Sequence, residues 1–523
     1  MGARLGGAAD TMAAMNASAE AIVQGLDDAQ LAAATTLRGP VRIIAGAGAG
    51  KTRTVTRRIA YACASGAWDP ARTLAVTFSV KAAAEMRSRL ASLGVGEQVT
   101  ASTFHAAALH QLRQVWPDIC EAPFPHVIRE PGHAIDQCMR RVLGTDQFGD
   151  AEVRAVLAEI NWCKVSLIAP SDYPRVCAAT HRQPPAGMEV DRLVDVMQEY
   201  ERVKTSHGEI DFNDILLLTC HILDDFPEEA AHIRAAIGWL TVDEYQDVSP
   251  LQHRLMGLWL NGNRDVCVVG DPAQTIYSFA GASSYDLLGF ASEFAPLSAD
   301  IDLGIDYRST PQVVGCANRV LSAAANREDY LKLTAARQGG ARVSRTVYDD
   351  DDEEARGVAM RIARMVSQGA VPDDFAVLTR INAQHRVVCR ALREQDLHYR
   401  VRRDAGWQHS ALEDEGAGPD QAQSQARQEA LEQIGAGAQQ GTQQGVTLST
   451  IHAAKGLEFK HVFIIGCSEG LLPFSSPSPG EQLEEERRLM YVGVTRAEDT
   501  LHLSYARRKD SSGGIARVPS RFL

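Results

Sequence analysis

Residues 41–53 read VRIIAGAGAGKTR, an apolar run followed by small residues and then by Lys-Thr-Arg. The run Val41–Ala45 predicts a buried strand, and the residues from Arg53 onward have a helical pattern. Small residues between a strand and a helix let backbone N–H groups turn toward an anion, and the helix adds its N-terminal partial positive charge. The stretch therefore predicts a phosphate-binding loop that includes Ala47, Gly48, Ala49 and Gly50.

Lys51 and Thr52 close this loop and suit the chemistry of a nucleoside triphosphate. The lysine would neutralise the β- and γ-phosphates, and the threonine hydroxyl would bind Mg²⁺. Ala45 stands where the strict GxxxxGK[ST] pattern has its first glycine. The alternative is an Ala/Gly-rich turn followed by a chance Lys-Thr pair, but the flanking strand and helix favour the nucleotide site.

A second segment, WLTVDEYQD at residues 239–247, carries the acids that hydrolysis requires. An apolar strand ends there in two adjacent carboxylates. Asp243 would hold magnesium, and Glu244 would polarise the attacking water. A lone Asp-Glu pair after a strand is usually an exposed loop, but the upstream phosphate loop favours a catalytic interpretation.

Composition limits the class of protein. The chain has 523 residues, 45% hydrophobic and 23% charged, which allows about three or four folded domains and excludes a disordered or fibrous protein. No run approaches the roughly 18 apolar residues of a membrane helix, and the N-terminus lacks a signal peptide. The ten cysteines form no CxxC pair or Cys/His cluster. This scatter argues against zinc, iron–sulfur clusters and disulfides, and predicts a cytoplasmic protein with no membrane partner.

The net charge of −13 at first disfavours a nucleic-acid partner. However, residues 403–445 contain seven acids and two bases, and residues 349–354 are six consecutive acids, which we expect on a solvated loop. These two segments carry −11 of the total charge, so the other residues are nearly neutral. The chain therefore has room for a locally basic groove.

Strand-like runs alternate with helical patterns over most of the chain, which predicts parallel sheets covered on both faces. Residues 109–210 interrupt this alternation with apolar positions at helical spacing, and we interpret them as a helical insertion. In residues 403–445, Gln, Ala and Gly supply 25 of 43 residues, which is typical of a linker.

An ordered series of segments resembles the motifs of the superfamily 1 DNA helicases of the UvrD/Rep/PcrA type. The segments are LDDAQ (26–30), AGAGAGKTR (45–53), TFSVKAAAEM (77–86), STFH (102–105), DEYQD (243–247), VGDPAQTIY (269–277), YRST (307–310), TIHAAKGLEF (450–459) and VGVTRA (492–497).

The resemblance implies an α/β protein with two RecA-like P-loop NTPase domains, each with a parallel sheet. The first domain (1A) would comprise residues 26–108 and 211–300, with a 1B-like helical insertion at 109–210. The second (2A) would comprise residues 301–402 and 446–523. Residues 1–25 would form a disordered tail.

The resemblance also implies how ATP and Mg²⁺ are bound. Besides the residues above, Gln30 would read the adenine edge, Tyr307 would stack on the base, Glu458 would meet the ribose, and Arg53 belongs to the phosphate-loop motif. Planar guanidinium groups suit a γ-phosphate whose charge spreads in the transition state. The catalytic residues would be Lys51, Asp243, Glu244, Gln274, Arg308 and Arg496.

A motor that accepts any DNA sequence needs flat faces on which bases can stack. The aromatic residues at the matching positions are Phe78, Tyr277 and Phe279; core packing is the alternative for each. Further DNA contacts implied by the resemblance are Ser79, Thr103, His105, His452 and Trp162, the last of which could equally be a core residue.

One family domain, called 2B, has no counterpart of sufficient length. Only residues 403–445 remain at its position, too few and too polar to form it. We therefore expect an ATP-driven translocase on single-stranded DNA, moving 3′ to 5′ by resemblance, with modest unwinding of its own and DNA repair or recombination as its setting. Its substrates would be single-stranded and tailed DNA, and an accessory protein or domain would supply further unwinding.

Two other function classes remain as alternatives. One is a DNA-binding ATP switch or protein-displacement factor, which ATP turnover without DNA stimulation would favour. The other is a metabolic phosphotransferase with the same loop, which leaves the arginine motifs and the aromatic residues unexplained.

Overall fold

The computed structural model describes residues 19–96, 98–144, 148–278, 281–403, 406–409, 445–509 and 516–523. Contacts divide the chain into two compact units. The first comprises Met1–Ile43, Thr52–Gly270 and Tyr277–Ile301, and the second Ile44–Lys51, Asp271–Ile276 and Asp302–Leu523. The phosphate loop and the turn at 271–276 thus belong to the second unit. Within the described ranges, no helix is both long enough and apolar enough to cross a membrane.

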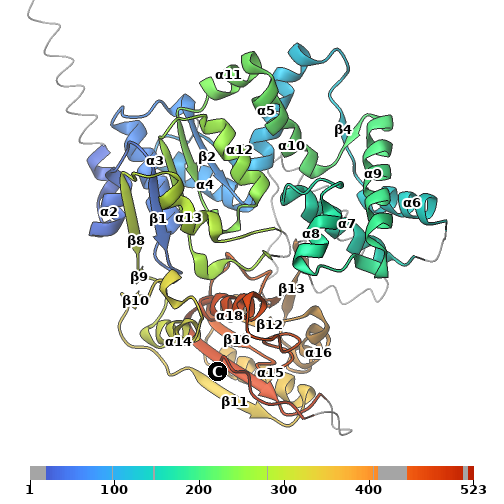
Figure 1. Ribbon diagram of the computed structural model, residues 1–523. Helices are drawn as coiled ribbons and strands as arrows, with labels where there is room; N and C mark the ends of the chain where they lie inside the picture. The colour runs from blue at the N-terminus through green and yellow to red at the C-terminus, as the bar shows by residue number, and fades with distance from the viewer. Residues whose placement is uncertain are drawn as a thin grey trace, which may run out of the picture. The chain divides into compact units, whose positions relative to one another are not determined.

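A six-stranded sheet has the order β3-β2-β6-β7-β1-β8. Figure 1 labels its strands β1, β2 and β8. Its strands are β1 (Val41–Ala45), β2 (Thr73–Thr77), β3 (Thr100–Thr103), β6 (Trp239–Val242), β7 (Val266–Gly270) and β8 (Ala299–Leu303). The β2–β3, β2–β6 and β6–β7 pairs are parallel. β2 and β7 are buried along their whole length, as expected for parallel strands covered on both faces.

Helices follow most of these strands, and polar residues cap many of them. The helices are α2 (Asp28–Thr35), α3 (Lys51–Ala64), α4 (Val80–Ser92), α5 (Phe104–Ile119), α10 (Phe212–Asp225), α11 (Pro227–Ala235), α12 (Pro250–Leu260) and α13 (Tyr285–Glu293). The Ser79 and Thr103 hydroxyls, for example, accept hydrogen bonds from the backbone N–H groups of Ala82 and Ala106, both at 3.2 Å. Such caps satisfy N–H groups that the first helical turn leaves unpaired.

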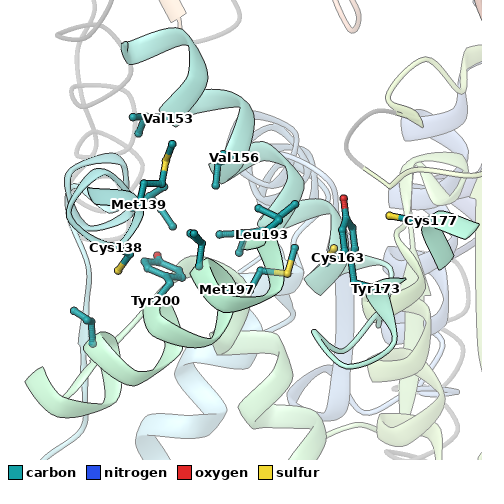
Figure 2. Close-up of a cluster of buried hydrophobic side chains, with 14 residues drawn as sticks. Cys138, Met139, Val153, Val156, Cys163, Tyr173, Cys177, Leu193, Met197 and Tyr200 are labelled. Atoms are coloured by element: carbon teal, nitrogen blue, oxygen red, sulfur yellow. The ribbon is translucent and has the colours of Figure 1, made fainter. Parts of the chain in front are cut away.

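The predicted helical insertion forms a helical layer with its own core. Its helices are α6 (Pro131–Leu143), α7 (Asp150–Val165), α8 (Tyr173–Thr180) and α9 (Val190–His207), and the short strands β4 (His126–Val127) and β5 (Glu209–Ile210) pair in parallel. Figure 2 shows the core, which includes Met139, Val156, Leu193 and Tyr200. These apolar side chains recur at helical spacing, which is why the sequence pattern identified the layer.

The predicted start of the insertion at residue 109 falls inside α5. This helix packs against α10, and its Phe104 ring stacks on Trp259 of α12 with the ring centroids 5.7 Å apart. The Trp259 indole N–H also donates to Gln111 Oε1 at 2.8 Å. Because α5 buries its apolar face against these helices, it continues past the expected boundary.

The second sheet has seven strands in the order β11-β17-β16-β12-β15-β13-β14. They are β11 (Ser344–Tyr348), β12 (Phe375–Thr379), β13 (Tyr399–Arg403), β14 (Gly406–His409), β15 (Val446–Thr450), β16 (Phe459–Ile464) and β17 (Ala497–Ala506). All the pairs are parallel except β13–β14. The α/β class with parallel sheets is therefore confirmed.

The helices of the second unit are α14 (Pro311–Ser322), α15 (Asp351–Ser367), α16 (His385–Glu394) and α18 (Glu481–Val494). Side chains of α15 and α16 share a core with β12, β15 and β16. A separate small sheet pairs β9 (Ile305–Asp306) with β10 (Thr334–Ala335). In the described part of the chain, the short 3₁₀ helices are η1 (Pro70–Arg72), η2 (Pro185–Gly187), η3 (Tyr245–Asp247), η4 (Pro272–Gln274), η6 (Arg327–Asp329), η7 (Pro372–Asp374) and η8 (Asn382–Gln384).

Three other expected boundaries differ from the structure. Residues 19–23 are helical, and the Gly25 carbonyl accepts a hydrogen bond from Arg53, so this part of the expected tail is ordered. The rest of that tail lies outside the described residues. β8 continues to Leu303, past the expected domain boundary at 300. β14 begins inside the expected linker because it pairs antiparallel with β13; most of the remaining linker also lies outside the described residues.

The acidic run at 349–354 does not lie on a loop, contrary to the prediction. Asp350 caps α15, and the next four acids form the first helical turn. The partial positive charge of a helix N-terminus favours acids at this position. The last of them, Glu354, is buried and accepts hydrogen bonds from Ser504 Oγ at 2.5 Å and Gly466 N at 3.1 Å.

Burial raises the pKa of Glu354 to about 7, although its two hydrogen bonds oppose this rise. The folded chain therefore holds a proton that the unfolded chain releases above its lower pKa, so stability falls as pH rises through this window. Relative to wild type, Glu354→Gln should gain about 3 kcal/mol of unfolding free energy between pH 5 and pH 8, since its amide does not titrate.

Urea unfolding at several pH values measures this difference. Glu353→Gln, at the exposed neighbouring position, should follow the wild-type pH dependence and serves as the control. Parallel pH curves for wild type and Glu354→Gln would show that Glu354 does not titrate in this range.

Candidate functional site

The phosphate loop joins the end of β1 to the start of α3 at Lys51. Gly48 and Gly50 have φ angles of +72° and +75°. A Cβ atom on Gly48 would lie 2.0 Å from Asp306 Oδ1, so both the backbone conformation and the space require glycine there. Ala47 and Ala49 are buried, whereas Lys51 and Thr52 at the helix start are half-buried. The loop therefore has the strand–turn–helix context that anion binding needs.

Tyr491 of α18 connects this loop to the turn at 271–276. Its hydroxyl lies 3.4 Å from the backbone N of Ala47 and 3.4 Å from Asp271 Oδ2. Burial, reinforced by the negative charge of Asp271, raises the pKa of Tyr491 well above its ordinary value. The hydroxyl is therefore protonated at neutral pH and able to donate to Asp271.

Gln274 and Arg496 meet in the same network. The Gln274 amide donates to Asp271 Oδ2 at 2.8 Å, and its Oε1 lies 3.4 Å from Arg496 Nη2. Lys455 Nζ donates to the Gln274 carbonyl at 2.6 Å, a contact that was not predicted. Arg496 is buried and also donates to the backbone carbonyls of Val492 and Leu457. The structure thus brings together two of the predicted catalytic residues.

Arg308 and Glu458, predicted to contact different parts of the nucleotide, form an ion pair with each other. Asp306 Oδ1 accepts hydrogen bonds from the backbone N–H groups of Arg308 and Ser309, at 2.8 and 2.9 Å, which fixes the turn that carries Arg308. The Tyr307 backbone N–H donates to the Gly48 carbonyl at 3.0 Å, and the Tyr307 ring is exposed. This turn therefore lies against the phosphate loop.

The predicted carboxylates lie where β6 ends. Asp243 is buried, and its Oδ1 accepts a hydrogen bond from the Glu244 backbone N–H at 2.9 Å. Glu244 has a φ of 55°, an uncommon conformation for a residue other than glycine, and its Oε2 accepts from Gln246 Nε2 at 2.5 Å. Backbone strain of this kind concentrates at functional sites. The Thr52 hydroxyl and the Asp243 carboxylate are hard oxygen donors of the kind that Mg²⁺ prefers.

Gln30 and Arg53 have local partners in the first unit. Gln30 is buried at the third position of α2 and forms a capping box with Asp27. Arg53 donates to the Gly25 carbonyl at 2.9 Å, which holds the segment before α2 against α3. Both contacts stabilise the local structure around α2 and α3.

Phe78 and Tyr277 follow different strands of the first sheet and stack on each other. Their ring centroids are 5.7 Å apart with the planes at 10°, and 44% of Phe78 is exposed. The hydroxyls of Ser79 and Thr103, also expected at the DNA, cap α4 and α5. The strands β2, β3 and β6 are parallel, so their carboxyl ends lie at the same edge of the sheet. Phe78, Thr103 and Asp243 are therefore at that edge.

His105 lies under a residue that sequence analysis missed. The rings of His105 and Phe212 stack with centroids 3.9 Å apart, and 41% of Phe212 is exposed. Burial lowers the pKa of His105 to about 3, although Asn213 and Asp211 oppose this shift. An exposed aromatic residue at the first position of a helix was the available signal, but its pairing with a residue so distant in sequence was not predictable.

The remaining residues predicted to contact DNA are Trp162, His452 and Phe279. Trp162 packs at the rim of the insertion core, and the Arg182 guanidinium covers its ring at 3.6 Å. Burial lowers the pKa of His452 to about 4, helped by the positive charges of Arg380 and Lys455. His452 is therefore neutral at physiological pH. Phe279 lies outside the described residues.

Comparison with known proteins places these residues in a family. Residues 26–295 match the model of the UvrD/REP helicase N-terminal domain, and residues 301–406 and 420–508 match that of the UvrD-like helicase C-terminal domain. The chain is 38% identical to the ATP-dependent DNA helicase UvrD2 of Mycobacterium tuberculosis, over 97% of this chain and 82% of the relative. It is 27% identical to the ATP-dependent DNA helicase PcrA of Bacillus subtilis, over 97% of this chain and 86% of the relative.

Both family models together match most of the chain, in the order that the sequence motifs predict. The parallel α/β sheets agree with the two RecA-like domains that the resemblance implied. The chain therefore belongs to the UvrD-like helicase family.

Proposed function

We propose that the protein is an ATP-dependent DNA helicase that translocates 3′ to 5′ on single-stranded DNA, in DNA repair or recombination. The observation that carries this proposal is the network of Tyr491, Asp271, Gln274 and Arg496 beside the phosphate loop. These side chains come from two distant segments, 271–274 and 491–496, and the Tyr491 hydroxyl also lies beside the backbone of the phosphate loop. A change at the γ-phosphate could therefore be passed to the segment that contains Tyr277, directly after the 271–276 turn.

The nucleotide chemistry would divide among the chain's own residues. Lys51 and the loop N–H groups would bind the phosphates, and Glu244 would orient and deprotonate the attacking water. Thr52 and Asp243 would hold Mg²⁺, which would supply charge neutralisation on the phosphate oxygens. Arg308 and Arg496 would stabilise the charge that develops during transfer. Arg308 would exchange its contact with Glu458 for the nucleotide.

The Phe78–Tyr277 stack would form part of the DNA track because flat rings accept any base. Tyr277→Ala should weaken DNA-stimulated turnover by about tenfold, since base–aromatic stacking stabilises by about 1–3 kcal/mol per base. Basal turnover should change little. Steady-state ATPase assays at increasing oligonucleotide concentration measure both.

Tyr285→Ala is the matched control because 79% of Tyr285 is exposed and it lies in the same unit. It should leave both rates at the wild-type level. Equal losses of basal and stimulated turnover in Tyr277→Ala would assign the Tyr277 ring to packing.

The chain is shorter than the alignments with its relatives, and this difference supports the proposal that it unwinds duplex DNA less well than larger family members. The alignments with UvrD2 and PcrA extend over 596 and 653 positions, more than the 523 residues of this chain, so these relatives contain segments that it lacks. The C-terminal family model also leaves residues 407–419 unmatched. We propose that the 2B domain is the missing segment and that the residues between β14 and β15 link the two parts of the second motor domain.

Loss of 2B would leave ATPase and translocation intact but reduce unwinding without an accessory protein or domain. Unwinding of duplexes with a 3′ or a 5′ single-stranded tail tests the proposal. We expect ATP-dependent separation of short 3′-tailed duplexes only. Processive unwinding of a duplex of hundreds of base pairs by the isolated chain would contradict the reduced unwinding, and a preference for 5′ tails would contradict the polarity.

The missing segment is also compatible with a second candidate function, a DNA-binding ATP switch or protein-displacement factor. A switch would bind DNA in an ATP-dependent way without directional movement. Displacement of streptavidin from biotinylated single strands separates the motor from the switch: a motor removes it from one end only, whereas a switch does not remove it. A displacement factor would remove streptavidin without separating short 3′-tailed duplexes.

A further inference from the structure

Five charged side chains join helices α7 and α9 of the insertion to the start of α10. Two lysines contact the same three carboxylates. Lys164 Nζ lies 2.7, 2.6 and 2.6 Å from oxygens of Glu201, Asp211 and Asp214. Lys204 Nζ lies 2.9, 2.8 and 2.5 Å from oxygens of the same residues. Every carboxylate therefore contacts both ammonium groups.

Because several of these side chains are buried, each charge needs an opposite charge beside it. The Lys204 side chain is 2% exposed and that of Asp211 is 7% exposed. Burial alone would raise the pKa of Asp211, but Lys164 and Lys204 lower it to about 2. Burial alone would lower the pKa of Lys164, but the three carboxylates raise it above its ordinary value. Removing one partner would leave an uncompensated buried charge, which is strongly destabilising.

The three carboxylates lie close enough together to hold a metal ion. Two ammonium groups already occupy the space between them and balance most of their charge. The ring of Tyr200 lies beneath both, 5.8 Å from Lys164 Nζ and 4.7 Å from Lys204 Nζ. Since Tyr200 belongs to the insertion core shown in Figure 2, the cluster is anchored in that core.

The same carboxylates build the first turn of α10. Asp211 Oδ1 accepts hydrogen bonds from the backbone N–H groups of Asn213 and Asp214, and Asp214 Oδ2 accepts from the Asp211 N–H at 2.8 Å. Asn213 also donates to Asn161 Oδ1 of α7 at 3.0 Å. Phe212 lies between these capping residues, and its ring covers His105. The position of the Phe212 ring thus depends on a helix end that the lysines hold.

We propose that Lys164 and Lys204 are positioning residues for the DNA track: they hold the first turn of α10 so that Phe212 stays stacked on His105. This inference rests on the proposed function, because His105 belongs to a segment expected at the DNA. Through the same contacts, α7 and α9 of the insertion are fixed to the track. Neither lysine needs to touch the DNA for this role.

The test uses Lys164→Met and Lys204→Met in the full chain, because methionine keeps much of the apolar side chain and removes the charge. Diethyl pyrocarbonate modifies accessible neutral imidazoles, and peptide mass spectrometry follows its reaction at His105. We expect faster modification of His105 in both variants than in wild type. Exposed His221 provides an internal reference that should react at an unchanged rate.

The affinity for a fluorescent single-stranded oligonucleotide is measured in parallel. It should fall by about tenfold in both variants, the loss expected from one misplaced stacking surface. Basal ATP turnover should stay at the wild-type level. Arg141→Met removes an exposed ion pair with Glu199 on the same insertion and should change neither readout.

Unchanged His105 modification, or faster modification with unchanged DNA affinity, would overturn the inference. If the methionine variants do not fold, Asp214→Asn provides the second test; it weakens the same cluster and should also speed His105 modification. A wild-type chain that does not bind single-stranded DNA would overturn the proposed function instead. The His105 rates would still show whether the lysines hold the stack, so the two failures are distinguishable.

Discussion

Replacing Lys51 with alanine is expected to lower ATP turnover by about a hundredfold to a thousandfold, with and without DNA. Lys51 begins α3 directly after a loop whose glycines have positive φ angles. Its ammonium group would supply the positive charge nearest to the transferred phosphate. Because the loop N–H groups remain in the variant, some nucleotide binding should persist. Phosphate release at saturating ATP measures the loss.

Lys460→Ala is the control for this experiment. Lys460 directly follows the 450–459 motif, but its side chain forms an exposed ion pair with Asp374 at 3.0 Å and has no role assigned at the nucleotide. It should keep wild-type turnover. Full activity in Lys51→Ala would contradict the catalytic role proposed for the phosphate loop.

Replacing Glu244 with glutamine should separate nucleotide binding from hydrolysis. The amide keeps the shape of the side chain but accepts no proton from water, so turnover should fall by about a hundredfold to ten-thousandfold. The affinity for a fluorescent ATP analogue should stay within a few-fold of wild type. Because Gln246 donates to Glu244 Oε2, the amide oxygen can retain this contact.

Glu229→Gln offers a matched control. Glu229 lies in the first turn of α11, and its substitution should affect neither binding nor turnover. Normal hydrolysis by Glu244→Gln would show that another group activates the water.

Several strands were predictable because they are continuous buried runs flanked by turn residues. The predicted bounds of β1 agree with the structure, and β6 ends directly before Asp243 as predicted. β17, with the sequence AEDTLHLSYA, was missed because polar residues interrupt its apolar positions. It forms a strand because β16 and β11 pair with it on either side. Tertiary pairing overrides local pattern in such cases.

Local chemistry was more predictable than the partners of each side chain. The phosphate loop and the Asp243–Glu244 pair follow their strands as expected. In contrast, Arg308 and Glu458 are 150 residues apart, and no sequence pattern predicted their ion pair. The lysine–carboxylate cluster and the His105–Phe212 stack were missed for the same reason. Each of these contacts depends on how distant segments fold together.

The central claim is that DNA and ATP hydrolysis are coupled in this chain. Its most direct test is the steady-state ATPase rate of the purified protein with no DNA, with single-stranded DNA and with blunt duplex DNA. We predict a rise of about tenfold or more with single-stranded DNA, within the usual range of coupling between sites, and a much smaller rise with blunt duplex. An ATPase rate that is the same with and without single-stranded DNA would contradict the claim.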